Sequence, residues 1–180
     1  MRLFHVSEES NIEVFKPRIP ARADIDKARG LVWAINEQCL PNFLTPRDCP
    51  RVAYYSTERS SKEDKSRFFS GADIRHVVAI ENKWFEVMKN TTLYLYEFDS
   101  EDFILQDEIA GYYVSDKEQI PINKIVVYDI FKEIFNRKVE LRLIPNLWGL
   151  AEEVKNSTLN WSLCRMGNAQ HSSVLTCPSG

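Results

Sequence analysis

Met1-Arg-Leu-Phe-His-Val-Ser7 opens the chain with the alternation of polar and apolar residues that is typical of a β-strand. Because side chains of a strand point to alternate faces, Leu3, His5 and Ser7 share one face. A strand at the N-terminus is usually paired into a sheet, since untethered ends fray. An imidazole and a hydroxyl on one face indicate a ligand-binding cleft or, alternatively, a core histidine that hydrogen-bonds to a backbone carbonyl.

The composition is that of a chain with one sizeable core. The sequence has 180 residues, of which 44% are hydrophobic, and predicts one globular domain over residues 1–168 with a poorly ordered tail over 169–180. The formal net charge of −3 provides no general attraction to nucleic acid or to an anionic membrane. We therefore expect neither as a partner, and the sequence does not determine the oligomeric state.

The N-terminal residues lack the apolar segment and cleavage site of a secretory signal peptide. No apolar run reaches the roughly 18 residues needed to cross a bilayer. The four cysteines form no Cys-x-x-Cys pair, and no histidine stands near them at the spacing of a zinc site. We expect a cytoplasmic protein with reduced thiols and no bound metal.

Short strands and short helices alternate along the rest of the chain. The strands alternate in polarity rather than being apolar throughout, and no long helix connects neighbouring strands, which favours an α+β domain with a mixed or antiparallel sheet. Two charged segments, 16–30 and 57–65, are predicted to be mobile loops, the first of them basic. Further strands are predicted at 31–35, 52–56, 75–81, 92–98, 111–115, 124–127 and 140–144, and short helices after Asn36, Asn82, Asp129 and Asn146.

Pro46-Arg-Asp-Cys-Pro-Arg51 is predicted to be a rigid turn because two prolines restrict its backbone. Arg47 and Arg51 are then presented with a smaller loss of entropy than on a flexible loop. Arginine pairs held in this way suit phosphate or carboxylate binding, although exposed arginines are also common without a ligand.

The standard motifs of several enzyme classes are missing. The sequence contains no Gly-x-Gly-x-x-Gly, no Gly-x-x-x-x-Gly-Lys-Ser/Thr and no Gly-x-Ser-x-Gly. A cysteine nucleophile paired with His5 or His76 has no motif to support it, and free cysteine is more often a small buried hydrophobe.

The chain resembles a family of uncharacterised small bacterial proteins that begin Arg-Leu-Phe-His-Val-Ser-Glu-Glu. The segments Val32-Trp-Ala-Ile35, Pro46-Arg-Asp-Cys-Pro-Arg51 and Gly111-Tyr-Tyr-Val-Ser115 fit that family too. The resemblance covers most of residues 1–168, and it implies no established activity.

A second resemblance is to the ADP-ribosyltransferase-like fold, and it implies a split sheet. Phe4-His5-Val6-Ser7 is similar to the first-strand signature that binds the nicotinamide-side ribose of NAD in that fold. Trp33 stands where the second strand carries an aromatic residue near nicotinamide. Gly111-Tyr-Tyr-Val-Ser-Asp116, followed by Gln119-Ile-Pro121, looks like the late segment that carries the catalytic glutamate.

The second resemblance implies a site for NAD. His5 and Ser7 would hold the ribose, Trp33 and Tyr113 would flank the nicotinamide ring, and an arginine of the proline-rich turn would hold the pyrophosphate. The implied NAD-binding residues are Ser7, Trp33, Arg47, Arg51, Tyr113 and Ser115.

The chain departs from this pattern at the catalytic carboxylate. Gly111 stands where the transferase family has glutamate, and glycine can neither orient a ribose hydroxyl nor stabilise an oxocarbenium-like transition state. Glu108 and Glu118 are near in sequence and could substitute only if the backbone bends, so His5 and Glu108 are the candidate catalytic residues.

Three functions are open at this point. The first is an enzyme of NAD-type or ADP-ribosyl transfer. The second is a catalytically silent protein that binds a nucleotide or a phosphorylated small molecule. The third is an RNA 2′-phosphotransferase-like enzyme, because one branch of the fold relies on arginine and histidine, which Arg2, Arg18, Arg47 and Arg51 could supply with His5.

Overall fold

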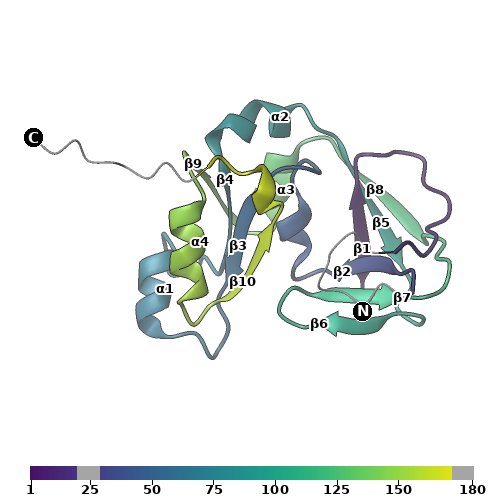
Figure 1. The fold of residues 1–180 in the computed structure, drawn as a ribbon, viewed down its shortest axis with the longest axis horizontal. Helices are drawn as coiled ribbons and strands as arrows, with labels where there is room; N and C mark the ends of the chain where they lie inside the picture. The colour runs from purple at the N-terminus through teal and green to yellow at the C-terminus, as the bar shows by residue number, and fades with distance from the viewer. Residues whose placement is uncertain (20–28, 172–180) are drawn as a thin grey trace, which may run out of the picture.

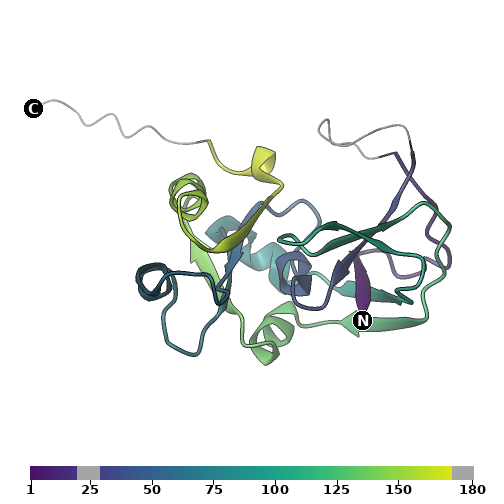
Figure 2. The ribbon, with the colours of Figure 1, turned by 90° about the horizontal axis from the view of Figure 1, so that it is seen from below.

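The computed structural model describes residues 1–19 and 29–171. Within these residues, ten strands form two separate sheets, accompanied by four short α-helices and three 3-10 helices. The sheets lie side by side, and helices α1 (Lys62–Phe68) and α4 (Trp148–Lys155) cover the outer side of the smaller one (Figures 1 and 2). The prediction of an α+β fold with short elements is confirmed. Residues 20–28 of the predicted basic loop and residues 172–180 of the predicted tail lie outside the described residues.

The larger sheet has six strands in the order β6-β7-β2-β1-β5-β8, and all its neighbours are antiparallel. The N-terminal strand lies inside the sheet, because β1 pairs with β2 on one side and with β5 on the other. The strands are β1 (Leu3–Ser7), β2 (Val32–Asn36), β5 (Leu93–Phe98), β6 (Ile104–Asp107), β7 (Tyr112–Ser115) and β8 (Asn123–Val127).

The smaller sheet has four strands in the order β10-β3-β4-β9. Its β4–β9 pair is parallel and its other two pairs are antiparallel, so this sheet is mixed. Strands β3 and β4 are buried along their whole length, which explains their nearly continuous apolar sequences. The strands are β3 (Arg51–Tyr55), β4 (His76–Glu81), β9 (Glu140–Ile144) and β10 (Asn160–Cys164).

The helices begin at side-chain caps in two cases. Ser61 accepts a hydrogen bond from the Asp64 amide at the start of α1, and Asp129 accepts one from the Lys132 amide at the start of α3 (Ile130–Asn136). The loop predicted over 57–65 is therefore wrong in its last residues, which form the first turn of α1. The other helices are α2 (Phe85–Lys89) and the 3-10 turns η1 (Leu40–Phe43), η2 (Asn82–Trp84) and η3 (Met166–Asn168).

Three hydrophobic clusters hold these layers together. The largest lies between the two sheets, and the second packs the outer face of the smaller sheet against α1 and α4. The third covers the outer face of the larger sheet, where Phe15 packs with Leu3, Tyr96 and Phe98. Since His5 shares a face with Leu3, it belongs to this outer face and not to the inter-sheet core.

Candidate functional site

His5 lies in the middle of β1 and is partly buried against the ring of Phe15, with ring centroids 4.8 Å apart. Its Nδ1 donates a hydrogen bond of 3.0 Å to the Trp33 carbonyl. Burial lowers the pKa of His5; the hydrogen bond to Trp33 opposes this shift, and the positive charges of Arg47 and Arg18 add to it. The ring is therefore neutral at neutral pH, with Nδ1 protonated and Nε2 left as an acceptor.

Two arginines lie close enough to His5 for their charges to act on it. Arg18 and Arg47 are both exposed, and neither forms an ion pair within the described residues. The turn that carries Arg47 is fixed to the end of β1, because the Arg47 amide donates a hydrogen bond of 2.7 Å to Glu8. Arg18 is positioned by two backbone hydrogen bonds with Leu31. The charges of both guanidinium groups thus act on a neutral histidine, and neither group has a carboxylate ion-pair partner within residues 1–19 and 29–171.

The segment after β1 folds back over the same face. Ser7 Oγ accepts a hydrogen bond from the Glu9 amide, which turns the chain at the end of the strand. Tyr96, directly opposite His5 on β5, donates to the Glu9 carbonyl and accepts from the Ile12 amide. The predicted role of Ser7 in ligand binding stays a prediction, and its hydroxyl has a local structural role.

The two aromatic residues expected to flank a nicotinamide ring lie on opposite faces of the sheet. Tyr113 pairs with Ala34, so it shares the face of His5. Trp33 pairs with Val114 and points to the other face, where its ring meets that of Tyr112 at 5.3 Å. The structure therefore brings Tyr113 to the side of His5, whereas Trp33 contributes only its carbonyl to that side.

Two other residues of the expected NAD site are held inside the fold. Arg51 is buried and donates hydrogen bonds to the carbonyls of Asn42 and Cys49, while its guanidinium lies 4.9 Å from the ring centre of Phe43. Ser115 is also buried, and its hydroxyl accepts hydrogen bonds from Gln119 and the Lys117 amide. Both side chains have structural partners, whereas the exposed side chain of Arg47 forms no ion pair within residues 1–19 and 29–171.

The candidate carboxylate Glu108 is exposed in the turn between β6 and β7. Gly111, where the resemblance expects glutamate, has a φ of +70°, and a Cβ placed there would lie 2.7 Å from Asn36 Oδ1 and 2.8 Å from Cys39. A larger residue therefore does not fit this position. The other neighbouring carboxylate, Glu118, is exposed and pairs with Lys16 at 3.6 Å.

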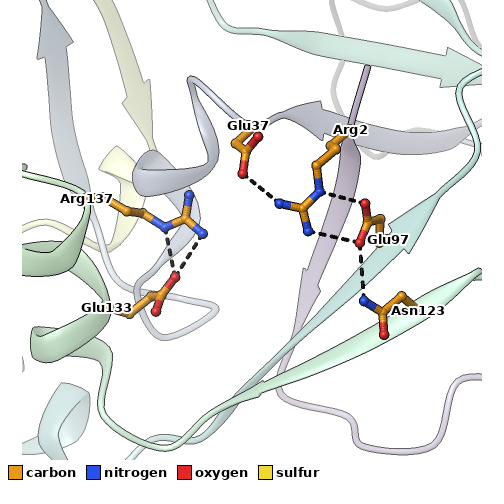
Figure 3. Close-up of polar contacts among 6 residues, drawn as sticks. All are labelled: Arg2, Glu37, Glu97, Asn123, Glu133 and Arg137. Carbon is orange, nitrogen blue, oxygen red and sulfur yellow. Dashed lines mark hydrogen bonds and ion pairs between the residues drawn. The ribbon is translucent and has the colours of Figure 1, made fainter.

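Arg2 is engaged in a cluster of ion pairs (Figure 3). Its Nε lies 2.7 Å from Glu97 Oε1, and a terminal nitrogen lies 2.9 Å from Glu37 Oε1. Glu97 also accepts a hydrogen bond from Asn123. The cluster connects the start of β1 to β5, β8 and the end of β2. Arg2 is therefore paired, whereas Arg18 and Arg47 form no ion pair among the described residues.

Two of the described cysteines, Cys39 and Cys49, are buried and are not prepared for nucleophilic chemistry. Burial raises the pKa of Cys39 to about 11 and that of Cys49 to about 12, so both thiols are protonated at neutral pH. Cys177 lies outside the described residues.

Over 1–19 and 29–171, no group of three His, Cys, Asp or Glu side chains could hold a metal ion. None of the helices described there has the length and hydropathy needed to cross a membrane.

A comparison with protein-family models matches residues 4–169 to a family described as "Family of unknown function (DUF6886)". The chain belongs to this family. Neither a search of curated proteins nor a search of solved structures finds a match. Membership in the family confirms the predicted resemblance to uncharacterised proteins, whereas the resemblance to ADP-ribosyltransferases stays a prediction.

The geometry on the His5 face is suited to recognising two chemical groups together. The neutral imidazole can accept a hydrogen bond from a hydroxyl. The guanidinium groups of Arg18 and Arg47, which form no ion pair in the part of the chain that the structure describes, can bind phosphate oxygens. Sequence reasoning identified His5 and Arg47, and it named Arg18 only among the arginines of the RNA 2′-phosphotransferase alternative. It did not single out Glu8. The available signal for Glu8 and Arg18 was their position, because they flank the segment that folds back over β1.

Proposed function

We propose that this protein binds a ribose-phosphate ligand of the nucleotide class on the outer face of the six-stranded sheet, around His5, Arg18 and Arg47. NAD and ADP-ribose are the first candidates for two reasons. Phe4-His5-Val6-Ser7 resembles the first-strand signature that binds NAD in the ADP-ribosyltransferase-like fold, and both ligands combine hydroxyl groups with a pyrophosphate. The expected division of roles is a hydroxyl on His5 and phosphate on the arginines.

One observation carries this proposal. His5 is held as a neutral acceptor by the Trp33 carbonyl, and the two arginines whose charges act on it have no ion-pair partner among the described residues. Exposed cations without a partner are common on protein surfaces. Two of them whose charges act on a partly buried histidine of fixed tautomer form a more specific arrangement, because two cations and a neutral acceptor can recognise the phosphate and hydroxyl groups of one ligand.

Isothermal titration calorimetry with NAD, ADP-ribose and adenosine tests the proposal directly. We expect NAD and ADP-ribose to bind with a Kd below about 1 mM, and adenosine at least about tenfold more weakly because it lacks phosphate. An absence of binding by both phosphorylated ligands at millimolar concentration would overturn the proposal.

Matched variants assign the binding to this face. Arg47→Ala removes one charged contact and should weaken ADP-ribose binding by about tenfold or more. Arg59→Ala, an equally exposed arginine elsewhere, should leave the affinity unchanged. His5→Ala distinguishes the alternatives left by the sequence, since lost stability with unchanged affinity would assign His5 to the core alone.

A second candidate function is NAD-dependent transfer, and Glu8 is the observation that favours it. The hydrogen bond from the Arg47 amide fixes the Glu8 carboxylate beside the end of β1. A fixed carboxylate can orient a ribose hydroxyl and stabilise positive charge that develops on the sugar. If the protein transfers ADP-ribose, wild type releases nicotinamide from NAD, and Glu8→Gln loses this release while its affinity for ADP-ribose stays within about twofold. If wild type binds NAD without releasing nicotinamide, the protein is a binding module.

A further inference from the structure

An open pocket of about 520 Å³ lies between the two sheets, away from the His5 face. Its walls come from the segment after β2, the start of β4, and the connection from α3 to β9. This volume is within the range that small ligands occupy in proteins. None of the side chains of the proposed nucleotide site lines it.

The floor of the pocket contains a histidine with a fixed tautomer. His76 is 9% exposed, and its Nε2 donates a hydrogen bond of 2.7 Å to Oδ1 of Asn42, which is itself buried. Nδ1 has no hydrogen-bond partner among the described residues, yet it is not one of their fully buried unpaired atoms. Nδ1 therefore keeps some exposed surface, and His76 is one of the residues that line the pocket. Burial lowers the pKa of His76 to about 4, so Nδ1 is an acceptor at neutral pH.

Charged side chains of both signs surround this acceptor. Glu37 and Arg137 line the pocket from different elements, and each has its own partner (Figure 3), Arg2 at 2.9 Å and Glu133 at 2.8 Å. Within each of these two ion pairs, the positive and the negative charge compensate each other. Three other charged side chains that line the pocket form no ion pair within the described residues: Asp73, Arg75 and Lys138.

Lys138 stands at a backbone position that normally favours glycine. It follows α3 with a φ of +56°, its amide donates to the Phe135 carbonyl, and the Val139 amide donates to the Ile134 carbonyl. This is a Schellman motif, in which glycine is usual at the left-handed position. A lysine there is strained, and strained residues occur preferentially where a side chain has a function.

We propose that this pocket binds a small zwitterionic ligand, a free amino acid or a short peptide, between the cations Arg75 and Lys138 and the carboxylate of Asp73. The cations bind the ligand carboxylate and Asp73 binds its ammonium group. His76 Nδ1 accepts a hydrogen bond from a ligand N–H. Since the charged groups are exposed, each contact is weak, and the expected Kd is on the order of 1 mM for the smallest ligands.

Imidazole ¹H–¹⁵N correlation spectra provide the test, because the chain has only three histidines. Four probes are titrated, namely glycine, glycylglycine, acetate and methylammonium. We expect at least one of the two zwitterions to shift the ¹⁵N resonance of His76 Nδ1 in a saturable manner, while the resonances of His5 stay unchanged. Acetate and methylammonium should cause no saturable shift. Binding of glycine assigns a free amino acid, and binding of glycylglycine alone assigns a peptide. Failure of both zwitterions, or equal binding of acetate, overturns the proposal.

Two lysine variants separate ligand binding from folding. Lys138→Gly relieves the strained backbone and should raise the Tm by about 2–4 °C, while it weakens binding of the zwitterion by at least about fivefold. Lys132→Ala changes an exposed lysine of α3 that does not line the pocket, and it should leave the affinity unchanged. Unchanged affinity in Lys138→Gly would overturn the assignment.

Discussion

Replacement of Gly111 by alanine should destabilise the fold strongly, because two independent costs meet at this position. The φ of +70° places residue 111 in the left-handed region, which costs an L-amino acid about 1–2 kcal/mol. The added Cβ would lie 2.7 Å from Asn36 Oδ1 and 2.8 Å from Cys39 Cβ and Sγ, so it forces a shift in packed surroundings, which typically costs about 1–3 kcal/mol. Together the two costs amount to roughly 2–5 kcal/mol, a large part of the about 5–15 kcal/mol available to a typical domain.

Urea unfolding followed by circular dichroism measures this difference. The midpoint should fall for Gly111→Ala at an unchanged m-value, since the surface exposed on unfolding is the same. Gly149→Ala is the matched control, because a Cβ at this position of α4 meets no atom within 4 Å. It should stabilise the protein by about 0.5–1 kcal/mol through higher helix propensity. If Gly111→Ala unfolds within about 0.5 kcal/mol of wild type, the steric reasoning for this position is refuted.

Three further changes have defined outcomes. His76 has a pKa of about 4 in the folded chain and about 6.5 when unfolded, so the unfolded chain takes up its proton first as the pH falls. The free energy of unfolding should therefore drop by up to about 3 kcal/mol between pH 7 and pH 4. Urea unfolding at both pH values measures this drop, which should be smaller in His76→Gln. Ser61→Ala removes the cap of α1 and should cost about 1 kcal/mol in the same assay, and an unchanged midpoint would contradict the cap. Arg51→Ala leaves buried carbonyls unpaired and should cost about 2–5 kcal/mol, whereas Arg47→Ala should change thermal stability by no more than about 0.5 kcal/mol.

The sequence predicts most strands to within one or two residues, whether they are buried along their whole length, as β3 and β4 are, or only in part, as β1 and β5 are. Strand β6 was not predicted because all four of its residues are exposed, and an edge strand without a buried face carries no alternation. Strand β10 is also missed, because Asn160-Trp-Ser-Leu-Cys164 contains no β-branched residue that would favour a strand. The first turn of α1 was mistaken for loop because its residues are charged and its cap is a serine within a polar run.

The candidate site was less predictable because a site depends on register between strands. The period of a strand shows which of its own residues share a face, but it does not show which face they share with the next strand. His5 and Trp33 illustrate this limit. Both lie on neighbouring strands, yet the pairing of Phe4 with Ile35 places the Trp33 ring on the face opposite to His5. Likewise, two arginines of one short turn, Arg47 and Arg51, differ because only Arg51 enters a buried strand.

The two interpretations of His5 that the sequence offered describe different atoms of one ring. The hydrogen bond from Nδ1 to the Trp33 carbonyl is the structural interaction expected of a core histidine. The same bond fixes the tautomer, and so it leaves Nε2 as the acceptor that a ligand hydroxyl requires. The positive charges of Arg18 and Arg47 favour this neutral form, because they disfavour a second proton on the ring. An anion bound to these arginines would neutralise their charges and raise the pKa of His5, whereas a sugar hydroxyl on Nε2 would favour the neutral ring and oppose the rise. The imidazole ¹⁵N shifts of His5 are therefore followed from pH 5 to 8 with and without inorganic phosphate, which carries no sugar hydroxyl. They should titrate at a higher pH when phosphate is bound, and an unchanged titration at saturating phosphate would place the bound phosphate elsewhere.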